Sequence, residues 1–157
     1  MPSIASKSRF IWAACIALGC SLLATGVALG EPASSGSVIQ VNVGNLRSLK
    51  GSIGCRLFSL EKSFPRGSEG TTRQGVRVSG PVTRCVFKDV PAGTYAVAVM
   101  HDENGNGKLD RNLVGIPIEG YGVSNNQTYA ARAPVWSESK FRVEAGKICE
   151  LEIALRY

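Results

Sequence analysis

Hydrophobic and polar residues alternate along most of the chain beyond residue 37, with the period of two that a half-buried β-strand shows. In the first such segment, Ile39, Val41 and Val43 are separated by the polar residues Gln40 and Asn42. The same alternation recurs at 53–57, 76–78, 83–87, 141–143 and 149–155, and the last two of these strands are joined by a turn at 145–147. Because no segment has a convincing helical period, the pattern predicts an all-β protein.

The segment 94–100 is different because it is apolar on both faces of a strand. One face would carry Tyr95, Val97 and Val99, and the other would carry Ala96, Ala98 and Met100. A strand of this kind is covered on both sides, as it is in the middle of a sheet. We therefore expect 94–100 to be a central strand.

Glycine and proline interrupt the strands at 51, 65–67, 80–81 and 91–93. About seven short strands separated by such turns are typical of an antiparallel β-sandwich. A small closed barrel is the alternative, since it requires the same alternation. The predicted sandwich domain covers residues 38–157 and follows a flexible segment at 31–37.

The beginning of the chain has the layout of a secretory signal peptide. Lys7 and Arg9 precede an uncharged run from Phe10 to Gly30. Cleavage after the small residues at 28–30 would leave 157 − 30 = 127 residues. Two alternatives are a retained transmembrane anchor, since the run is long enough to span a bilayer, and lipid attachment at Cys20. The sequence thus predicts a periplasmic or secreted protein that meets the membrane only through an uncleaved leader.

The mature chain carries a mild and dispersed positive charge. Without Lys7 and Arg9 it has 16 basic and 12 acidic side chains, a net charge of 16 − 12 = +4. The basic residues are scattered singly, and no cluster indicates a nucleic-acid site. We expect a partner in the envelope or the extracellular space, whose identity the sequence does not give.

Three cysteines lie in the mature chain, each within a strand-like run. An odd number allows at most one internal pair. We expect a disulfide between Cys55 and Cys85, because both lie at mid-strand and a bridge enclosing about 30 residues stabilises a domain in an oxidising compartment. The alternative is three buried free thiols, and the state of Cys149 is left open.

Two segments do not alternate, and both are longer than ordinary connections: 61–75 and 102–134. The second begins with a run in which oxygen-bearing groups take positions one, three, five, seven and nine of a calcium-type loop: Asp102, Asn104, Asn106, the carbonyl of Lys108, and Asp110. Gly107 takes position six, where such a loop turns sharply. The spacing therefore predicts a calcium site between two strands.

The match to a calcium loop is incomplete. Leu113 stands at position twelve in place of the bidentate glutamate, and the offset of Glu119 is wrong for that role. Asp, Asn and Gly are also the residues that tight turns select. A metal-free loop, in which Asp102 and Asp110 cap local turns, is therefore the competing interpretation.

The run from Pro91 to Asp110, together with Gly115–Gly122 and Ser124–Asn126, resembles a family of secreted bacterial proteins catalogued as domain of unknown function 2141. The resemblance extends from about Val38 to Tyr157. It implies an extracytoplasmic β-sandwich of transthyretin-like or immunoglobulin-like kind, and it implies no activity. Met100 is a mild departure, since an aromatic residue is common there.

Three hypotheses for function follow. The first is a non-catalytic secreted module whose loop 102–134 is ordered by calcium and presents a binding surface. The second is a metal-free sandwich that binds a glycan or a peptide. Its expected ligand surface is made of Glu119, Tyr121, Asn125 and Asn126, which mix aromatic and hydrogen-bonding groups. The favoured alternative for these residues is a packed loop held in place by Tyr121. The third is a hydrolase centred on His101, the only histidine, although its place at the end of an apolar strand favours a buried structural residue.

Overall fold

The computed structural model describes residues 36–127 and 132–157. The predicted signal peptide at 1–30, with Cys20, and nearly all of the segment 31–37 lie outside the described residues. Within the two described ranges, no helix has the length and apolar character needed to cross a bilayer.

Strands are the main regular structure of the described chain, as the alternation predicts. The strands are β1 (Ser37–Gly44), β2 (Ser52–Phe58), β3 (Thr71–Arg77), β4 (Thr83–Val90), β5 (Gly93–Asp102), β6 (Tyr121–Val123), β7 (Phe141–Val143) and β8 (Ile148–Ala154). Helical structure in the described ranges is limited to single turns at η1 (Glu61–Ser63), η2 (Ser124–Asn126) and α1 (Trp136–Ser139).

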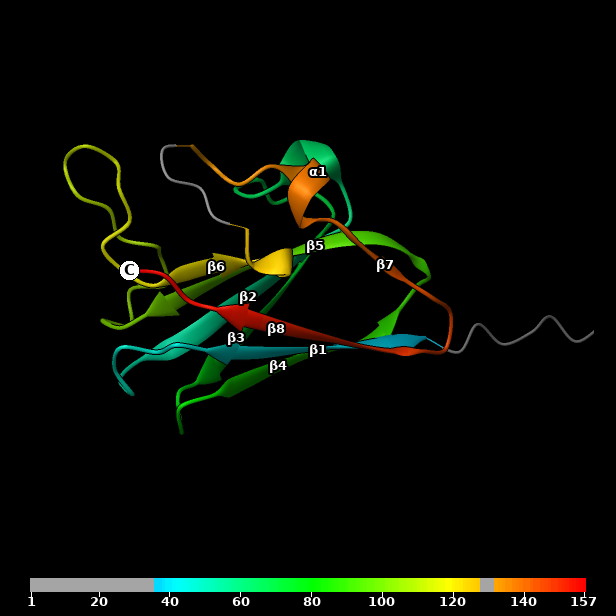
Figure 1. Cartoon of the computed structure of the whole chain (residues 1–157), viewed down its shortest axis with the longest axis horizontal. Helices are drawn as coiled ribbons and strands as arrows, with labels where there is room; N and C mark the ends of the chain where they lie inside the picture. The colour runs from blue at the N-terminus through cyan, green and yellow to red at the C-terminus, as the bar shows by residue number, and fades with distance from the viewer. Residues whose placement is uncertain (1–35, 128–131) are drawn as a thin grey trace, which may run out of the picture. The chain divides into compact units, whose positions relative to one another are not determined.

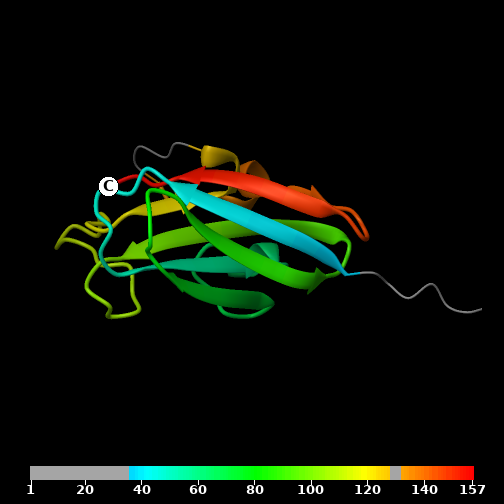
Figure 2. The ribbon, with the colours of Figure 1, turned by 90° about the horizontal axis from the view of Figure 1, so that it is seen from below.

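The strands form two facing sheets, which confirms the β-sandwich (Figures 1 and 2). Sheet A has the order β4-β1-β8, and sheet B has the order β3-β2-β5-β6, with β7 paired to β5. Strand β5 lies between β2 and β6, so the doubly apolar segment is central, as expected. The sheets do not close into a barrel.

Three details of the sheets differ from the sequence pattern. Strands β7 and β8 do not pair across the turn at 145–147: β7 pairs with β5, and β8 pairs with β1 in parallel. The turn, with Gly146 at φ 68°, therefore carries the chain from one sheet to the other. Strand β3 begins at Thr71, inside a segment expected to be a loop, because it is an exposed edge strand with few apolar residues.

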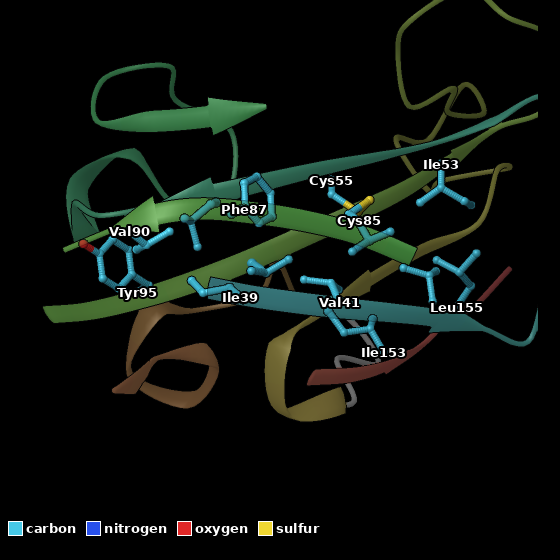
Figure 3. Packing of buried hydrophobic residues seen from close by; sticks show 14 of the residues in the cluster. Ile39, Val41, Ile53, Cys55, Cys85, Phe87, Val90, Tyr95, Ile153 and Leu155 are labelled. Carbon is cyan, nitrogen blue, oxygen red and sulfur yellow. A yellow bond between two sulfur atoms is a disulfide. The ribbon is translucent and has the colours of Figure 1, made fainter. Parts of the chain in front are cut away.

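The core lies between the sheets and is built from the inward-facing residues of the alternating segments. It includes Ile39, Val41, Ile53, Val97 and Ile153, each 0 or 1% exposed (Figure 3). The predicted disulfide is present: Cys55 on β2 is joined to Cys85 on β4, with the two Cα atoms 6.5 Å apart. It links sheet B to sheet A through the middle of the core. Cys149 is a free, half-buried thiol, and burial raises its pKa.

The outer face of sheet B is covered at only one end. There Phe58 contacts Phe64 edge to face with ring centroids 5.2 Å apart, and Phe64 contacts Trp136 in the same manner at 6.1 Å. Two segments thus form a small second layer on this face: the residues between η1 and β3, and the α1 turn (Figure 1). The residues that the structure describes leave the remainder of that face open, and it borders the long loop after β5.

Reduction of the disulfide tests its contribution to stability. Because the bridge encloses 30 residues of sequence, we expect dithiothreitol, or the double substitution Cys55→Ala/Cys85→Ala, to lower the free energy of unfolding by about 3 kcal/mol. Urea denaturation followed by circular dichroism measures this change. The matched control is Cys149→Ala, which should leave the response to dithiothreitol intact; an unchanged urea midpoint after reduction would contradict the prediction.

Candidate functional site

The long connection between β5 and β6, residues 103–120, projects from one end of the sandwich beside the C-terminus (Figure 1). The connection between β1 and β2 lies at the same end, since Ser52 is paired with Asp102. We call residues 103–120 the β5–β6 loop, and its outermost part, residues 111–118, the tip.

The carboxylate of Asp102 organises the first turns of this loop. One of its oxygens accepts hydrogen bonds from the backbone N–H groups of Gly105 and Asn106, at 2.8 and 3.0 Å. The other accepts from the N–H of Gly107 at 2.8 Å. Gly105 and Gly107 have φ values of 78° and 74°, a backbone region that glycine adopts without strain. Asp102 is only 5% exposed, so these bonds replace its contacts with water.

A second buried carboxylate, that of Glu119, holds the base of the loop. It accepts hydrogen bonds from the N–H of Glu103 at 3.0 Å and from the N–H of Asp110 at 3.1 Å. Glu119 is 4% exposed. Together the two carboxylates bind five backbone N–H groups, and such charge-assisted bonds are stronger than neutral ones. The loop is therefore fixed to the end of the sandwich.

The residues of the predicted calcium site lie close together around Asp110. Its carboxylate accepts hydrogen bonds from the amide Nδ2 of Asn104 at 2.6 Å and from that of Asn106 at 2.9 and 3.0 Å. The two amide oxygens accept from backbone N–H groups two residues further on. Among the described residues, no group of three or more His, Cys, Asp or Glu side chains is placed to hold a metal.

A calcium ion would thus rely on amide and backbone oxygens as well as carboxylates. Each amide oxygen keeps a second lone pair, and the carboxylate of Asp110 faces the same space as Asn104 and Asn106. The carboxylate of Asp102 already accepts three N–H bonds. The donor types suit a hard cation, while the small number of free carboxylate oxygens favours weak binding.

His101 lies behind the loop and is fully buried. Its Nε2 is 2.8 Å from the carbonyl oxygen of Lys50, to which it donates, and its Nδ1 is 2.8 Å from the hydroxyl of Tyr157, from which it then accepts. The same hydroxyl accepts the backbone N–H of Arg47 at 3.1 Å. Burial raises the pKa of Tyr157, which keeps its proton available for His101.

The β1–β2 connection is attached to the loop by an ion pair between Arg47 and Glu103. Ser48 donates to the other carboxylate oxygen at 2.7 Å, and Arg47 also donates to the carbonyl of Ile118 at 3.0 Å. The hydrogen bond from Arg47 holds the pKa of Glu103 below its ordinary value. Both ends of the β5–β6 loop are therefore connected to the neighbouring loop.

The tip is a small hairpin with exposed apolar side chains. The backbones of Arg111 and Pro117 form an antiparallel β-bridge. The side-chain oxygen of Asn112 accepts hydrogen bonds from the N–H groups of Val114 and Ile116, at 3.1 and 2.9 Å. Four apolar side chains of the tip are at least half exposed: Leu113, Val114, Ile116 and Ile118. A cluster of this kind on a soluble domain is a feature of interaction surfaces.

An open groove of about 1090 Å³ runs along the outer face of sheet B beside this hairpin. Its floor is formed by β2, β3, β5 and β6, one wall by residues 107–117, and the opposite side by residues 65–66 and 132–134. Val114 and Ile116 belong to the wall. One acidic side chain, that of Asp102, lines the groove. Six basic side chains also line it: Arg56, Arg66, Arg73, Lys108, Arg111 and Arg132.

The expected ligand surface is divided between different places. Tyr121 lines the groove. Glu119 is buried under the loop, as described above. Asn125 donates to the carbonyls of Glu138 and Lys140, and the side chain of Asn126 bonds the backbone of β8 at Glu152 and Ala154. The two asparagines therefore hold η2 against its neighbours.

The sequence pattern did not single out the arginines on the groove floor. Arg56 and Arg73 are separated by a turn and an irregular segment, and each looks like an isolated surface charge. Only the pairing of β2 with β3 brings them opposite one another. The available signal was the glycine at position 75, which leaves a strand without a side chain and so exposes its surface.

One family model matches residues 41–149; it is described as an uncharacterized protein conserved in bacteria (DUF2141). No curated protein and no solved structure matches the chain.

The role of Asp102 in fixing the loop is tested by Asp102→Asn. The amide keeps the shape but removes the charge and one acceptor oxygen, so we expect a loss of about 2–3 kcal/mol in the free energy of unfolding. We also expect trypsin to cut several-fold faster after Lys108 or Arg111, because the loop opens more often. Asp89→Asn is the control, since Asp89 is exposed at a positive φ that asparagine tolerates. Equal cleavage rates in both variants would show that Asp102 does not hold the loop.

Proposed function

The chain belongs to this family of bacterial proteins, and from that premise we propose that it is a non-catalytic, extracytoplasmic binding module whose ligand lies in the groove beside the β5–β6 loop. The observation that carries the proposal is the way the loop is held. Five backbone N–H bonds to buried Asp102 and Glu119 fix a wall whose exposed side chains, Val114 and Ile116, border the groove.

A fixed wall favours binding because little conformational entropy is lost when the ligand arrives. Apolar side chains on a mobile loop can fold back onto their own sheet, whereas those of the tip are held out by the turn at Asn112. Val114 is 78% exposed and Ile116 is 59% exposed. Covering them would remove apolar surface from water, which is the main source of affinity at such sites.

Two observations support a location outside the cytoplasm. Disulfides persist in oxidising compartments, and Cys55–Cys85 is buried in the core of this domain. The charge and hydropathy pattern of residues 1–30 is that of a signal peptide. The proposed location is therefore the periplasm or the exterior of the cell.

The state of His101 supports a non-catalytic role. A general base must reach the proton that it removes. His101 is 0% exposed, and both of its ring nitrogens are engaged, one by Lys50 and one by Tyr157. Through these two hydrogen bonds, His101 attaches both the segment between β1 and β2 and the C-terminus to β5.

A neutral fluorescent probe, N-phenyl-1-naphthylamine, tests whether the groove binds apolar molecules. We expect saturable binding that is lost at least tenfold in Gly75→Leu. A Cβ at Gly75 meets no atom within 4 Å, so the leucine side chain extends into the groove without disturbing the sheet.

Gly80→Leu is the matched control, because a Cβ there also meets nothing within 4 Å and Gly80 does not line the groove. It should bind the probe as the unchanged protein does. Absence of saturable binding, or equal binding by both leucine variants, would refute the groove as the ligand site.

We propose in addition that calcium orders the loop by binding among Asp110, Asn104, Asn106 and the carbonyl of Lys108, with one remaining lone pair of Asp102. Asn104 and Asn106 lie within hydrogen-bond distance of Asp110, and calcium binding would require their amide groups to turn, so that the oxygens face the ion in place of the nitrogens that now donate to Asp110. The ion would add a further constraint to a loop that the buried carboxylates already hold.

Thermal unfolding in calcium and in chelator tests this proposal. At 10 to 100 times the dissociation constant, calcium should stabilise the fold by about 1.5–3 kcal/mol, which raises Tm by several degrees. Asp110→Ala should remove the calcium response, while Asp89→Asn should keep it. If Tm is the same in calcium and in chelator, the loop is ordered by its own hydrogen bonds and the metal-free alternative holds.

A further inference from the structure

Two arginines face each other on the floor of the groove. Arg56 on β2 is directly paired with Arg73 on β3, and both line the groove. Like charges at opposed positions of neighbouring strands destabilise a sheet. Arg56 is half-buried, and its pKa is lowered by burial and, to a smaller degree, by the charge of Arg73. The sheet therefore keeps an unfavourable pair where an anion would relieve it.

The remaining bonds of these side chains do not neutralise them. Arg56 donates to the carbonyl oxygens of Arg66 and Gly67, at 3.3 and 3.2 Å, and so holds the backbone of Arg66, which also lines the groove, beside it. Within residues 36–127 and 132–157, the ion pairs involve other cations, and none includes Arg56, Arg66 or Arg73. A guanidinium has five N–H donors, so this group of three retains donors for a carboxylate or a phosphate.

The rest of the floor is flat and largely apolar. Gly54 is paired with Gly75 on one side and with Met100 on the other. The side chain of Met100 lies over Gly54, since a Cβ there would be 3.0 Å from the methionine methyl carbon. The wall with Val114 and Ile116 stands beyond this surface, near the Ser52 end of β2. Arg56 is four positions along β2 from Ser52, which is about 13 Å along a strand.

The groove thus has a cationic part and an apolar part, arranged along β2. The hairpin wall stands at one end, and Pro65 and Arg66 lie near the other. A flat bilayer surface would meet the hairpin wall and residues 65–66 before it reached Arg56, which is half-buried on the floor. A single molecule with an acidic group and a hydrocarbon chain can enter the groove and contact both parts.

We propose that the ligand is a free, single-chain anionic amphiphile, with its acidic group at Arg56, Arg66 and Arg73 and its hydrocarbon chain over Met100 toward Val114 and Ile116. This inference rests on the proposed function, because it names the ligand class of the same groove.

Displacement of N-phenyl-1-naphthylamine by decanoate and by 1-decanol, at pH 8 and below micelle formation, tests the charge preference. Decanoate should displace the probe at a concentration at least tenfold lower than decanol does, and decyltrimethylammonium should be the weakest. Arg56→Gln and Arg73→Gln should each reduce the preference for decanoate severalfold. Because Arg73→Gln removes one member of a repelling pair, it should not lower Tm, whereas Arg56→Gln also removes the hydrogen bonds to the carbonyls of Arg66 and Gly67.

Arg142→Gln is the matched control, since Arg142 is an exposed arginine on β7 outside the groove. Ile116→Ser should weaken decanoate and decanol alike, because the tip contacts the chain and not the acidic group. If decanoate and decanol displace the probe equally, the arginine site is refuted while the binding groove stands. If the probe itself does not bind, the proposed function fails first.

Sedimentation with phosphatidylglycerol vesicles separates the free amphiphile from a membrane lipid. We expect the protein to remain in the supernatant at physiological ionic strength. Co-sedimentation that is lost in Arg73→Gln would show that the arginines bind the head groups of a bilayer, and would overturn the proposal of a free ligand.

Discussion

A carboxylate removed from water needs hydrogen-bond donors, and a loop that leaves a sheet needs acceptors for its backbone N–H groups. Asp102 and Glu119 satisfy both requirements at once, since their four oxygens accept five N–H bonds from the same loop. Everything that distinguishes this end of the sandwich depends on that arrangement. Without it the tip would have no fixed position, and the groove would lose one of its walls.

The parts of the fold that depend on local pattern were predictable from the sequence. Alternation placed β1, β2, β4 and β8 to within a few residues, and the doubly apolar run identified β5 as central. Cys55 and Cys85 could be paired because both occupy inward positions at mid-strand. Strand β3 was largely missed, because its exposed face carries Thr, Arg and Gly in place of an apolar alternation. The partners of β7 and β8 depend on whether the turn at 145–147 keeps the chain in one sheet or carries it to the other. The alternation of hydrophobic and polar residues does not determine that choice.

In the candidate site, too, the features set by neighbouring residues were predictable from the sequence, and those assembled from distant segments were not. The turns capped by Asp102 could be recognised from the spacing after β5, because Asp102, Gly105 and Gly107 act within a few residues of one another. The calcium site predicted from the same spacing stays a prediction. The groove was not apparent, because it is assembled from β2, β3, the β5–β6 loop and the segment around residue 66. Charges that seemed dispersed along the sequence are concentrated by the register of one pair of strands. The glycine at position 75 was the available signal, but a single glycine in a strand does not identify a groove.

The parallel pairing of β1 with β8 has a consequence for the order in which the domain can form. The first strand lies in the middle of sheet A, and one of its two neighbours is the last strand of the chain (Figure 2). While the chain is being made, β1 can pair with β4 alone, and its other edge remains bare until residue 154 has emerged. Contacts that join the two ends of a chain form slowly. Sheet A, and the part of the core that β1 and β8 share, can therefore be completed only after β8 has been made.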